Sequence, residues 1–176
     1  MKAPELQIQQ WFNTKDSPTL AALRGKVVVI EAFQMLCPGC VSHGLPLAQK
    51  IHNMFPKDKV AVLGLHTVFE HHDAMQPVSL AAFLHEYQIT FPVAVDLPGT
   101  GAMPETMQSY QMRGTPSLIL IDKAGDIRAN HFGNVSELML GAEIATLIGA
   151  VAPDDIEPST EGFAQTGCNE EGCSLP

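Results

Sequence analysis

Basic residues are scarce in this chain of 176 residues. It has 10 Lys and Arg against 19 Asp and Glu, a formal net charge of −9 at pH 7, and no local cluster of basic residues offsets this excess. Proteins that bind nucleic acids through the phosphates carry the opposite charge. We therefore expect no nucleic-acid partner.

Long apolar runs are also missing. No run approaches the roughly 20 apolar residues that a membrane-spanning helix needs. Residues 1–12 lack the layout of a signal peptide, in which basic residues precede an apolar stretch. We therefore expect no membrane partner and a monomer in the cytoplasm. The alternative is a periplasmic or other extracytoplasmic location, if a signal segment precedes these residues.

Apolar segments and turn-forming segments alternate along the first 149 residues. Runs rich in β-branched residues predict strands at residues 27–33, 60–65, 92–95, 116–122 and 127–132. Helical spacing of apolar residues predicts helices at residues 38–55, 79–87, 104–112 and 136–147. This order predicts one α/β domain at residues 1–149, with a sheet that is mixed at its edge.

The composition changes after residue 149. Residues 150–176 contain six acids, no Lys or Arg, and many Pro, Gly, Ser and Thr residues, which predicts a flexible acidic tail. Cys168 and Cys173 lie in this segment, separated by four residues. One hypothesis is that they form a secondary redox pair that exchanges electrons with the first two cysteines. A metal-binding or inert tail is the alternative.

Cys37 and Cys40 form the first of two close cysteine pairs, and close pairs indicate redox chemistry or metal binding. They follow a buried strand and open a helix. If Pro38 occupies the first helical turn, Cys37 lies at the helix N-terminus and Cys40 about one turn inside. Because only a thiolate attacks a disulfide, this asymmetry predicts that Cys37 is the nucleophile and Cys40 the shielded resolving thiol.

Metal binding is the rival interpretation of the same residues. A Cys-x-x-Cys motif is also half of many zinc sites, and His43 follows Cys40 by three residues. A copper or zinc carrier would use these three side chains or the tail pair. His66, His71 and His72 follow the strand at residues 60–65, and we expect them at the same sheet edge as Cys37. They form either a metal site or a solvated polar loop.

Two motifs together resemble a known family. They are Leu-Arg-Gly-Lys-Val-Val-Val-Ile-Glu-Ala-Phe at residues 23–33, before Cys-Pro-Gly-Cys at 37–40, and Tyr-Gln-Met-Arg-Gly-Thr-Pro-Ser at 110–117. The chain resembles the thioredoxin superfamily, and within it the TlpA-like thiol–disulfide oxidoreductases, over residues 3–149. The resemblance implies a three-layer fold with a central mixed sheet, helices on both faces, an N-terminal extension and an inserted helix and strand.

The resemblance also implies an activity. An enzyme of this kind exchanges its dithiol with protein disulfides and with a redox partner, without a bound cofactor or metal, and we expect this one to act as a reductase. The Thr115–Pro116 bond is expected to be cis and to line the substrate groove. Glu31 is expected to be a buried acid that moves a proton at Cys40, and burial raises the pKa of a carboxyl. Four residues around the active turn are expected to contact substrate: Met35, Leu36, Pro38 and Gly39.

The sequence departs from its relatives at the active turn. Leu36 stands directly before Cys37, where many relatives have Trp, so the aromatic cover of the rim is missing. Peroxide reduction of the peroxiredoxin type is disfavoured. Gln34 stands where those enzymes carry Thr or Ser, and Ile30 stands where they carry proline.

Overall fold

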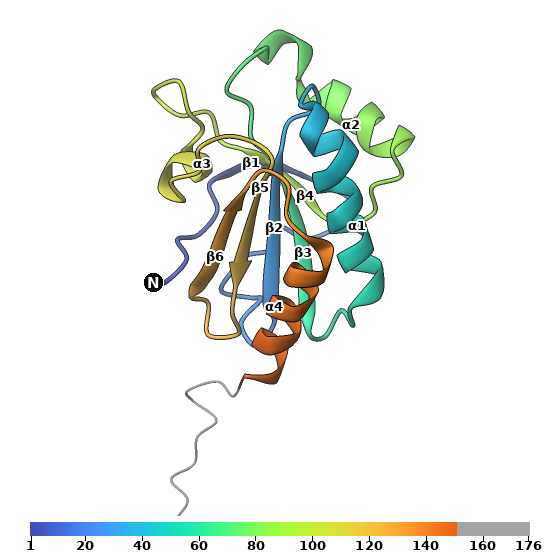
Figure 1. Cartoon of the computed structure of the whole chain (residues 1–176). Helices are drawn as coiled ribbons and strands as arrows, with labels where there is room; N and C mark the ends of the chain where they lie inside the picture. The colour runs from blue at the N-terminus through green and yellow to red at the C-terminus, as the bar shows by residue number, and fades with distance from the viewer. Residues whose placement is uncertain (151–176) are drawn as a thin grey trace, which may run out of the picture.

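A six-stranded mixed sheet forms the centre of the computed structural model, which describes residues 1–150 (Figure 1). Its strands lie in the order β1-β4-β3-β2-β5-β6. Central strand β2 runs parallel to β3 and antiparallel to β5, so the predicted mixed sheet is confirmed. The strands are β1 (Ile8–Phe12), β2 (Val27–Phe33), β3 (Val60–His66), β4 (Val93–Asp96), β5 (Ser117–Ile121) and β6 (Ile127–Phe132).

Helices cover both faces of the sheet, as predicted. They are α1 (Leu45–Met54), which follows a π-helical turn (Cys40–Gly44), α2 (Pro77–Glu86), α3 (Glu105–Ser109) and α4 (Glu137–Gly149), with a short 3-10 helix (His72–Ala74) before α2. Apolar residues of α1, α2 and α4 share one core cluster, and those around α3 share a second cluster on the other face. Among residues 1–150, no helix is long and apolar enough to cross a membrane.

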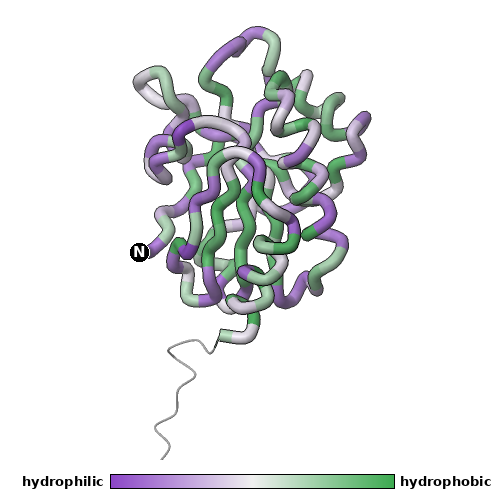
Figure 2. The backbone as a smooth tube through the Cα atoms, in the orientation of Figure 1, coloured by the Kyte–Doolittle hydropathy of each residue, from purple (hydrophilic) through white to green (hydrophobic). Residues whose placement is uncertain are grey.

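Strand β2 is buried along its whole length. Its side chains alternate between the two core clusters, with Val29 and Phe33 on the α1 face and Val28 and Ile30 on the α3 face. A strand covered on both faces needs apolar residues at every position, which explains the run without alternation in the sequence. Figure 2 shows the resulting hydrophobic centre. Glu31 is the one charged residue in this strand.

The loops that carry the site meet at one edge of the sheet. Strands β2, β3 and β4 are parallel, so their carboxyl ends point the same way. The segments that follow them contain Cys37, residues 67–76 and residues 97–104. They gather at the upper end of the molecule in Figure 1, opposite the end of α4. In open α/β sheets, this edge is where ligands and substrates bind.

Asp96 stabilises this edge of the sheet from the interior of the protein. Its buried carboxylate accepts hydrogen bonds from the Thr67 hydroxyl (2.9 Å) and from the backbone amides of Thr106 (2.9 Å) and Met107 (3.0 Å). It therefore ties the end of β3 to β4 and satisfies the free amides at the start of α3. Helix α3 is shorter than the predicted residues 104–112, because the chain leaves the helix at Tyr110 and Gln111 adopts a left-handed backbone (φ 52°).

Candidate active site

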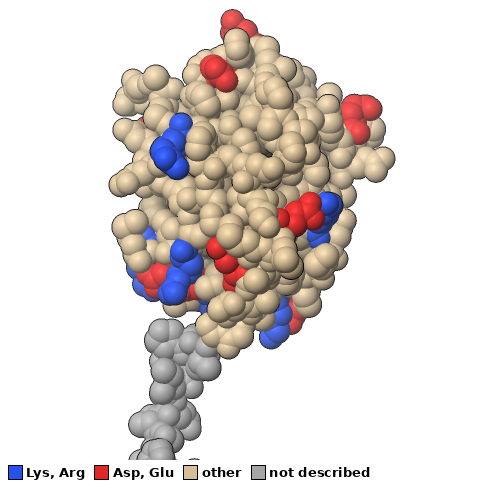
Figure 3. Space-filling model, in the orientation of Figure 1, with Lys and Arg blue, Asp and Glu red and all other residues tan. Residues whose placement is uncertain are grey.

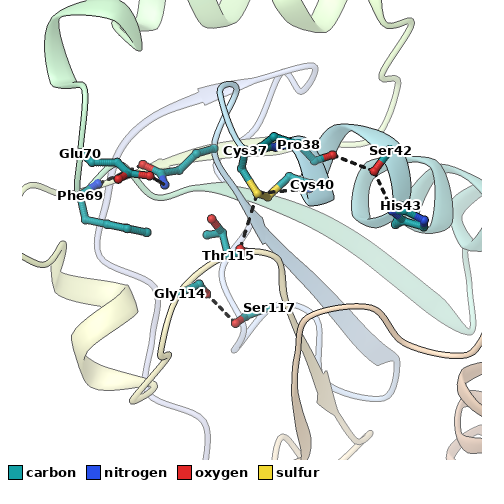
Figure 4. Close-up of a disulfide and its surroundings, with 11 residues drawn as sticks. Cys37, Pro38, Cys40, Ser42, His43, Phe69, Glu70, Gly114, Thr115 and Ser117 are labelled. Atoms are coloured by element: carbon teal, nitrogen blue, oxygen red, sulfur yellow. Dashed lines mark hydrogen bonds between the residues drawn. A yellow bond between two sulfur atoms is a disulfide. The ribbon is translucent and has the colours of Figure 1, made fainter.

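Cys37 and Cys40 form a disulfide at the start of the helix that leads into α1 (Figure 4). Their Cα atoms lie 5.2 Å apart. The helical backbone begins at Pro38, as the sequence predicts, because a proline at the first helical position loses no hydrogen bond. Cys37 therefore lies at the helix N-terminus, with Cys40 one turn inside.

The two sulfurs have different surroundings. Cys40 is completely buried, whereas Cys37 is partly exposed. The backbone amide of Cys40 donates a hydrogen bond to the sulfur of Cys37 at 3.2 Å. In the reduced protein the same donor would stabilise a thiolate on Cys37, together with the positive end of the helix dipole. One sulfur of the pair is therefore accessible, whereas the other is enclosed.

The Thr115–Pro116 peptide bond is cis, which confirms that expectation. The carbonyl oxygen of Thr115 lies 3.5 Å from the sulfur of Cys37. Pro116 packs against the start of the helix, where a Cβ added at Gly39 would be 3.4 Å from its Cδ. The Ser117 hydroxyl donates to the Gly114 carbonyl at 2.7 Å, which braces the same loop. The loop therefore lies directly beside the disulfide.

Glu31 is buried on the α1 face of β2, with a side chain that is 1% exposed. Its Oε1 atom has no hydrogen-bond partner among the described residues, and burial raises the pKa of this carboxyl well above its usual value. A cavity of about 10 Å³ adjoins it, lined also by His43, Gly44 and Asn134. That volume is at the lower limit for one water molecule. Glu31 is therefore a desolvated acid with room for one small proton-carrying neighbour.

Gly44 is needed because Glu31 approaches the helix so closely. A Cβ at position 44 would overlap the Glu31 carboxylate and would stand 3.2 Å from Cβ of Pro116. Gly44 ends the π-helical turn, in which the Leu45 amide bonds the Cys40 carbonyl five residues back. Pro46 lies two residues after Gly44 and has no backbone N–H to donate. A proline ring in a helix clashes with a carbonyl of the preceding turn, and the wider π-helical turn before Pro46 relieves this clash.

The predicted substrate contacts differ in their availability. Leu36 is 58% exposed, Pro38 is exposed and Gly39 is partly exposed, so all three border the disulfide on the surface. Met35 does not match its predicted role. Its side chain is 8% exposed and belongs to the core cluster on the α1 face. Proximity to Cys37 in the sequence suggested a contact, but the turn directs this side chain inward.

Gln34 connects two loops at the site. Its amide nitrogen donates to Glu70 at 3.4 Å, and its amide oxygen accepts from the Phe69 backbone at 3.3 Å (Figure 4). The Ser42 hydroxyl, which donates to the Pro38 carbonyl at 2.8 Å, similarly closes the first helical turn. The role of Gln34 could not be predicted from the sequence, because it depends on which loops meet.

The histidines do not assemble a metal site. His43 is exposed and bonds Ser42, His71 and His72 are exposed, and His66 is buried at the end of β3. Among residues 1–150, no group of three His, Cys, Asp or Glu side chains is placed to hold a metal ion. The metal-carrier hypothesis is therefore not supported for Cys37, Cys40 and His43. Cys168 and Cys173 lie outside the described residues, and their redox role stays a prediction.

His66 lies between the ring of Phe33 and a cavity of about 200 Å³ that opens between the loops after β3 and β4. Its side chain is 1% exposed, and neither ring nitrogen has a partner among the described residues. Burial disfavours the charged ring and lowers the pKa of His66 to about 4. The imidazole is thus neutral at physiological pH.

This neutral histidine predicts a pH dependence of stability. In the unfolded chain His66 takes up a proton near pH 6.5, but in the folded chain only near pH 4, so stability falls as pH drops between these values. Relative to His66→Gln, the wild type should lose about 2 to 3 kcal/mol of unfolding free energy between pH 7 and pH 4.5. Denaturant titrations measure this. The exposed His85→Gln is the control, and equal pH slopes for wild type and His66→Gln would refute it.

Comparisons with known proteins agree with this geometry. The AhpC/TSA family model matches residues 1–130. The crystal structure of the thioredoxin-like superfamily protein SPOA0173 is 78% identical, with a TM-score of 0.86, and the match covers 87% of this chain and 99% of that one. A thiol-disulfide isomerase from Corynebacterium glutamicum is 51% identical, with a TM-score of 0.81, over 85% of this chain and 98% of that one.

A further relative is much longer than this chain. Protein DipZ of Mycobacterium tuberculosis is 30% identical over 145 residues, which are 78% of this chain and 20% of DipZ. This chain thus spans about a fifth of the length of DipZ. The family match covers the strand before Cys37, the disulfide and the cis-proline loop. The chain therefore belongs to the AhpC/TSA family of the thioredoxin-like superfamily, which confirms the predicted resemblance to thiol–disulfide oxidoreductases.

Proposed function

We propose that this protein reduces disulfides in protein substrates with its Cys37–Cys40 dithiol. The observation that carries the proposal is the asymmetry of the pair: Cys37 reaches the surface and accepts a backbone hydrogen bond, whereas Cys40 is fully buried behind it. The pair sits beside a cis-proline loop whose Thr115 carbonyl faces the same sulfur.

The reaction proceeds in two exchanges. The Cys37 thiolate attacks one sulfur of the substrate disulfide, so a mixed disulfide forms and the other substrate sulfur leaves as a thiolate. The Cys40 thiolate then attacks the sulfur of Cys37, which releases the second substrate thiolate. The product is the Cys37–Cys40 disulfide that the structure holds. The dithiol of a redox partner protein reduces it again by the same exchange, and no bound cofactor is needed.

Three groups assist these steps in the proposal. Thr115 and Pro116 hold the substrate chain, because their loop adjoins Cys37. Leu36, Pro38 and Gly39 form the opposite border of the groove. Glu31 accepts the proton of Cys40 when Cys40 must become a nucleophile, and the small cavity beside Glu31 leaves room for one water. A carboxyl with a raised pKa suits this exchange, because its proton affinity approaches that of a thiol.

The cysteine roles are tested by two substitutions. Cys37→Ser should abolish reduction of insulin by dithiothreitol above the uncatalysed rate, because the sulfur of Cys40, the one left in the pair, is buried. Cys40→Ser, reduced and then freed of dithiothreitol, should instead accumulate a covalent complex with insulin, because no second thiol resolves the mixed disulfide. Turbidity and non-reducing gels measure the two outcomes. Full activity of Cys37→Ser, or a complex trapped through Cys40, would contradict the assignment.

The direction of electron flow is tested by equilibration with glutathione buffers. We expect the reduction potential of the Cys37–Cys40 pair to be about −230 mV or more negative, because the proposed reductase must give electrons to the disulfides of its substrates. The readout is the fraction of alkylated protein at each ratio of reduced to oxidised glutathione. A potential near −120 mV, typical of a strong oxidant, would overturn the reductase assignment. The cytoplasmic location and the monomeric state stay predictions of the same proposal.

Glu31→Gln should separate stability from activity. Because burial raises the pKa of Glu31, its carboxylate penalises the folded state increasingly as pH rises above about 4, and a neutral amide removes this penalty. The variant should therefore be more stable than wild type at pH 8 but not at pH 4. Its insulin reduction at pH 7 should fall about tenfold or more. The exposed Glu86→Gln is the control; unchanged activity of Glu31→Gln would remove the proton-transfer role.

A further inference from the structure

Arg113 and Phe132 form an exposed pair next to the cis-proline loop. The guanidinium carbon of Arg113 lies 5.2 Å from the centre of the Phe132 ring, within the range of a cation–π contact. Phe132 ends β6 and is 48% exposed. Its ring rests on the backbone of Gly114, where an added Cβ would stand 3.0 Å from Cε2. The pair thus joins the end of β6 to the loop before β5.

The Arg113–Phe132 pair lies beside the loop that contacts the disulfide. Arg113 precedes Thr115 by two residues, and the Thr115 carbonyl lies 3.5 Å from the sulfur of Cys37. Phe132 pairs in register with Ser117, and the amide of Gly133 donates to the Pro116 carbonyl at 2.9 Å. The aromatic ring and the cation therefore flank the loop that would hold the substrate chain.

The charge of Arg113 is free for a partner. Arg113 is exposed and has no ion pair among residues 1–150, whereas Lys2, Lys50 and Arg128 each face a carboxylate. On the face that Figure 3 draws, charged side chains are few and most of the surface is uncharged. Outside residues 150–176, the chain has 13 Asp and Glu against 10 Lys and Arg, so this part is only mildly acidic. The groove border thus carries an isolated attraction for a negative group.

We propose that Arg113, held over Phe132, is a specificity-determining residue that selects protein substrates with Asp or Glu close to the reactive cysteine. The inference rests on the proposed function, because it assigns a substrate class to the same groove. An extended substrate chain that pairs with the backbone at Thr115 places every second side chain on one face. A residue roughly two positions from the substrate cysteine then reaches Arg113.

Matched peptides test this inference. The substrates are cysteine peptides, each joined through its cysteine to the same neutral small thiol. The two peptides of a pair differ only in having Glu or Gln two residues from the cysteine. One pair carries this residue before the cysteine and a second pair carries it after. The dithiol protein should reduce the Glu peptide about two- to fivefold faster in kcat/KM at low salt, the effect of one exposed ion pair. This preference should vanish in Arg113→Gln and in 1 M NaCl, where the Debye length is about 3 Å.

A control variant makes the result specific. Arg128→Gln removes the same type of side chain from β6, the strand that carries Phe132, and it should keep the wild-type preference. Arg113→Gln should reduce the Glu and the Gln peptide at equal rates, because the charge that distinguishes them is gone. Equal rates for both peptides in the wild type, or a preference that survives in Arg113→Gln, would overturn the inference. Failure of the wild type to reduce either peptide or insulin would instead contradict the proposed function.

Discussion

The hydrogen bond from the Cys40 amide to the sulfur of Cys37 is the contact on which the proposed chemistry depends. An unperturbed thiol with a pKa of about 8.5 is roughly 3% ionised at pH 7. Lowering that value by two units takes about 2.7 kcal/mol. A helix dipole typically supplies only about 0.3–1 kcal/mol, so directed donors must supply the remainder. Because Pro38 has no amide proton, the Gly39 and Cys40 amides are the donors left at this helix start.

Close packing behind the disulfide explains the other unusual residues. Two glycines in the first turns of the helix let Pro116 and the Glu31 carboxylate approach the backbone, and any side chain at Gly44 would displace them. Burying an acid without a partner costs stability. Buried acids with a perturbed pKa, such as Glu31 beside this disulfide, are typical of active sites. The same packing keeps Cys40 away from solvent until Cys37 has reacted.

Much of this architecture could be predicted from the sequence, because local signals determine it. Buried β-branched runs located β2, β3 and β5 to within two residues, and Ser136 correctly marked the start of α4. Features that depend on tertiary contacts could not be predicted. The π-helical turn adds one residue per turn without changing the apolar spacing, and Met35 points inward because of the turn that follows β2. The Arg113–Phe132 pair could not be predicted, because Arg113 lies in the loop before β5 and its contact with β6 depends on how that loop folds.

The most direct test of the account is the rate at which the reduced protein reacts with iodoacetamide as a function of pH. Cys37 should be alkylated first, with a half-maximal rate below about pH 7.5, as for thiols held at helix N-termini. Cys40 should stay unmodified until the protein unfolds, because its side chain is fully buried. A rate that rises only near pH 8.5, as for a free cysteine, or equal reactivity of both thiols, would contradict the account.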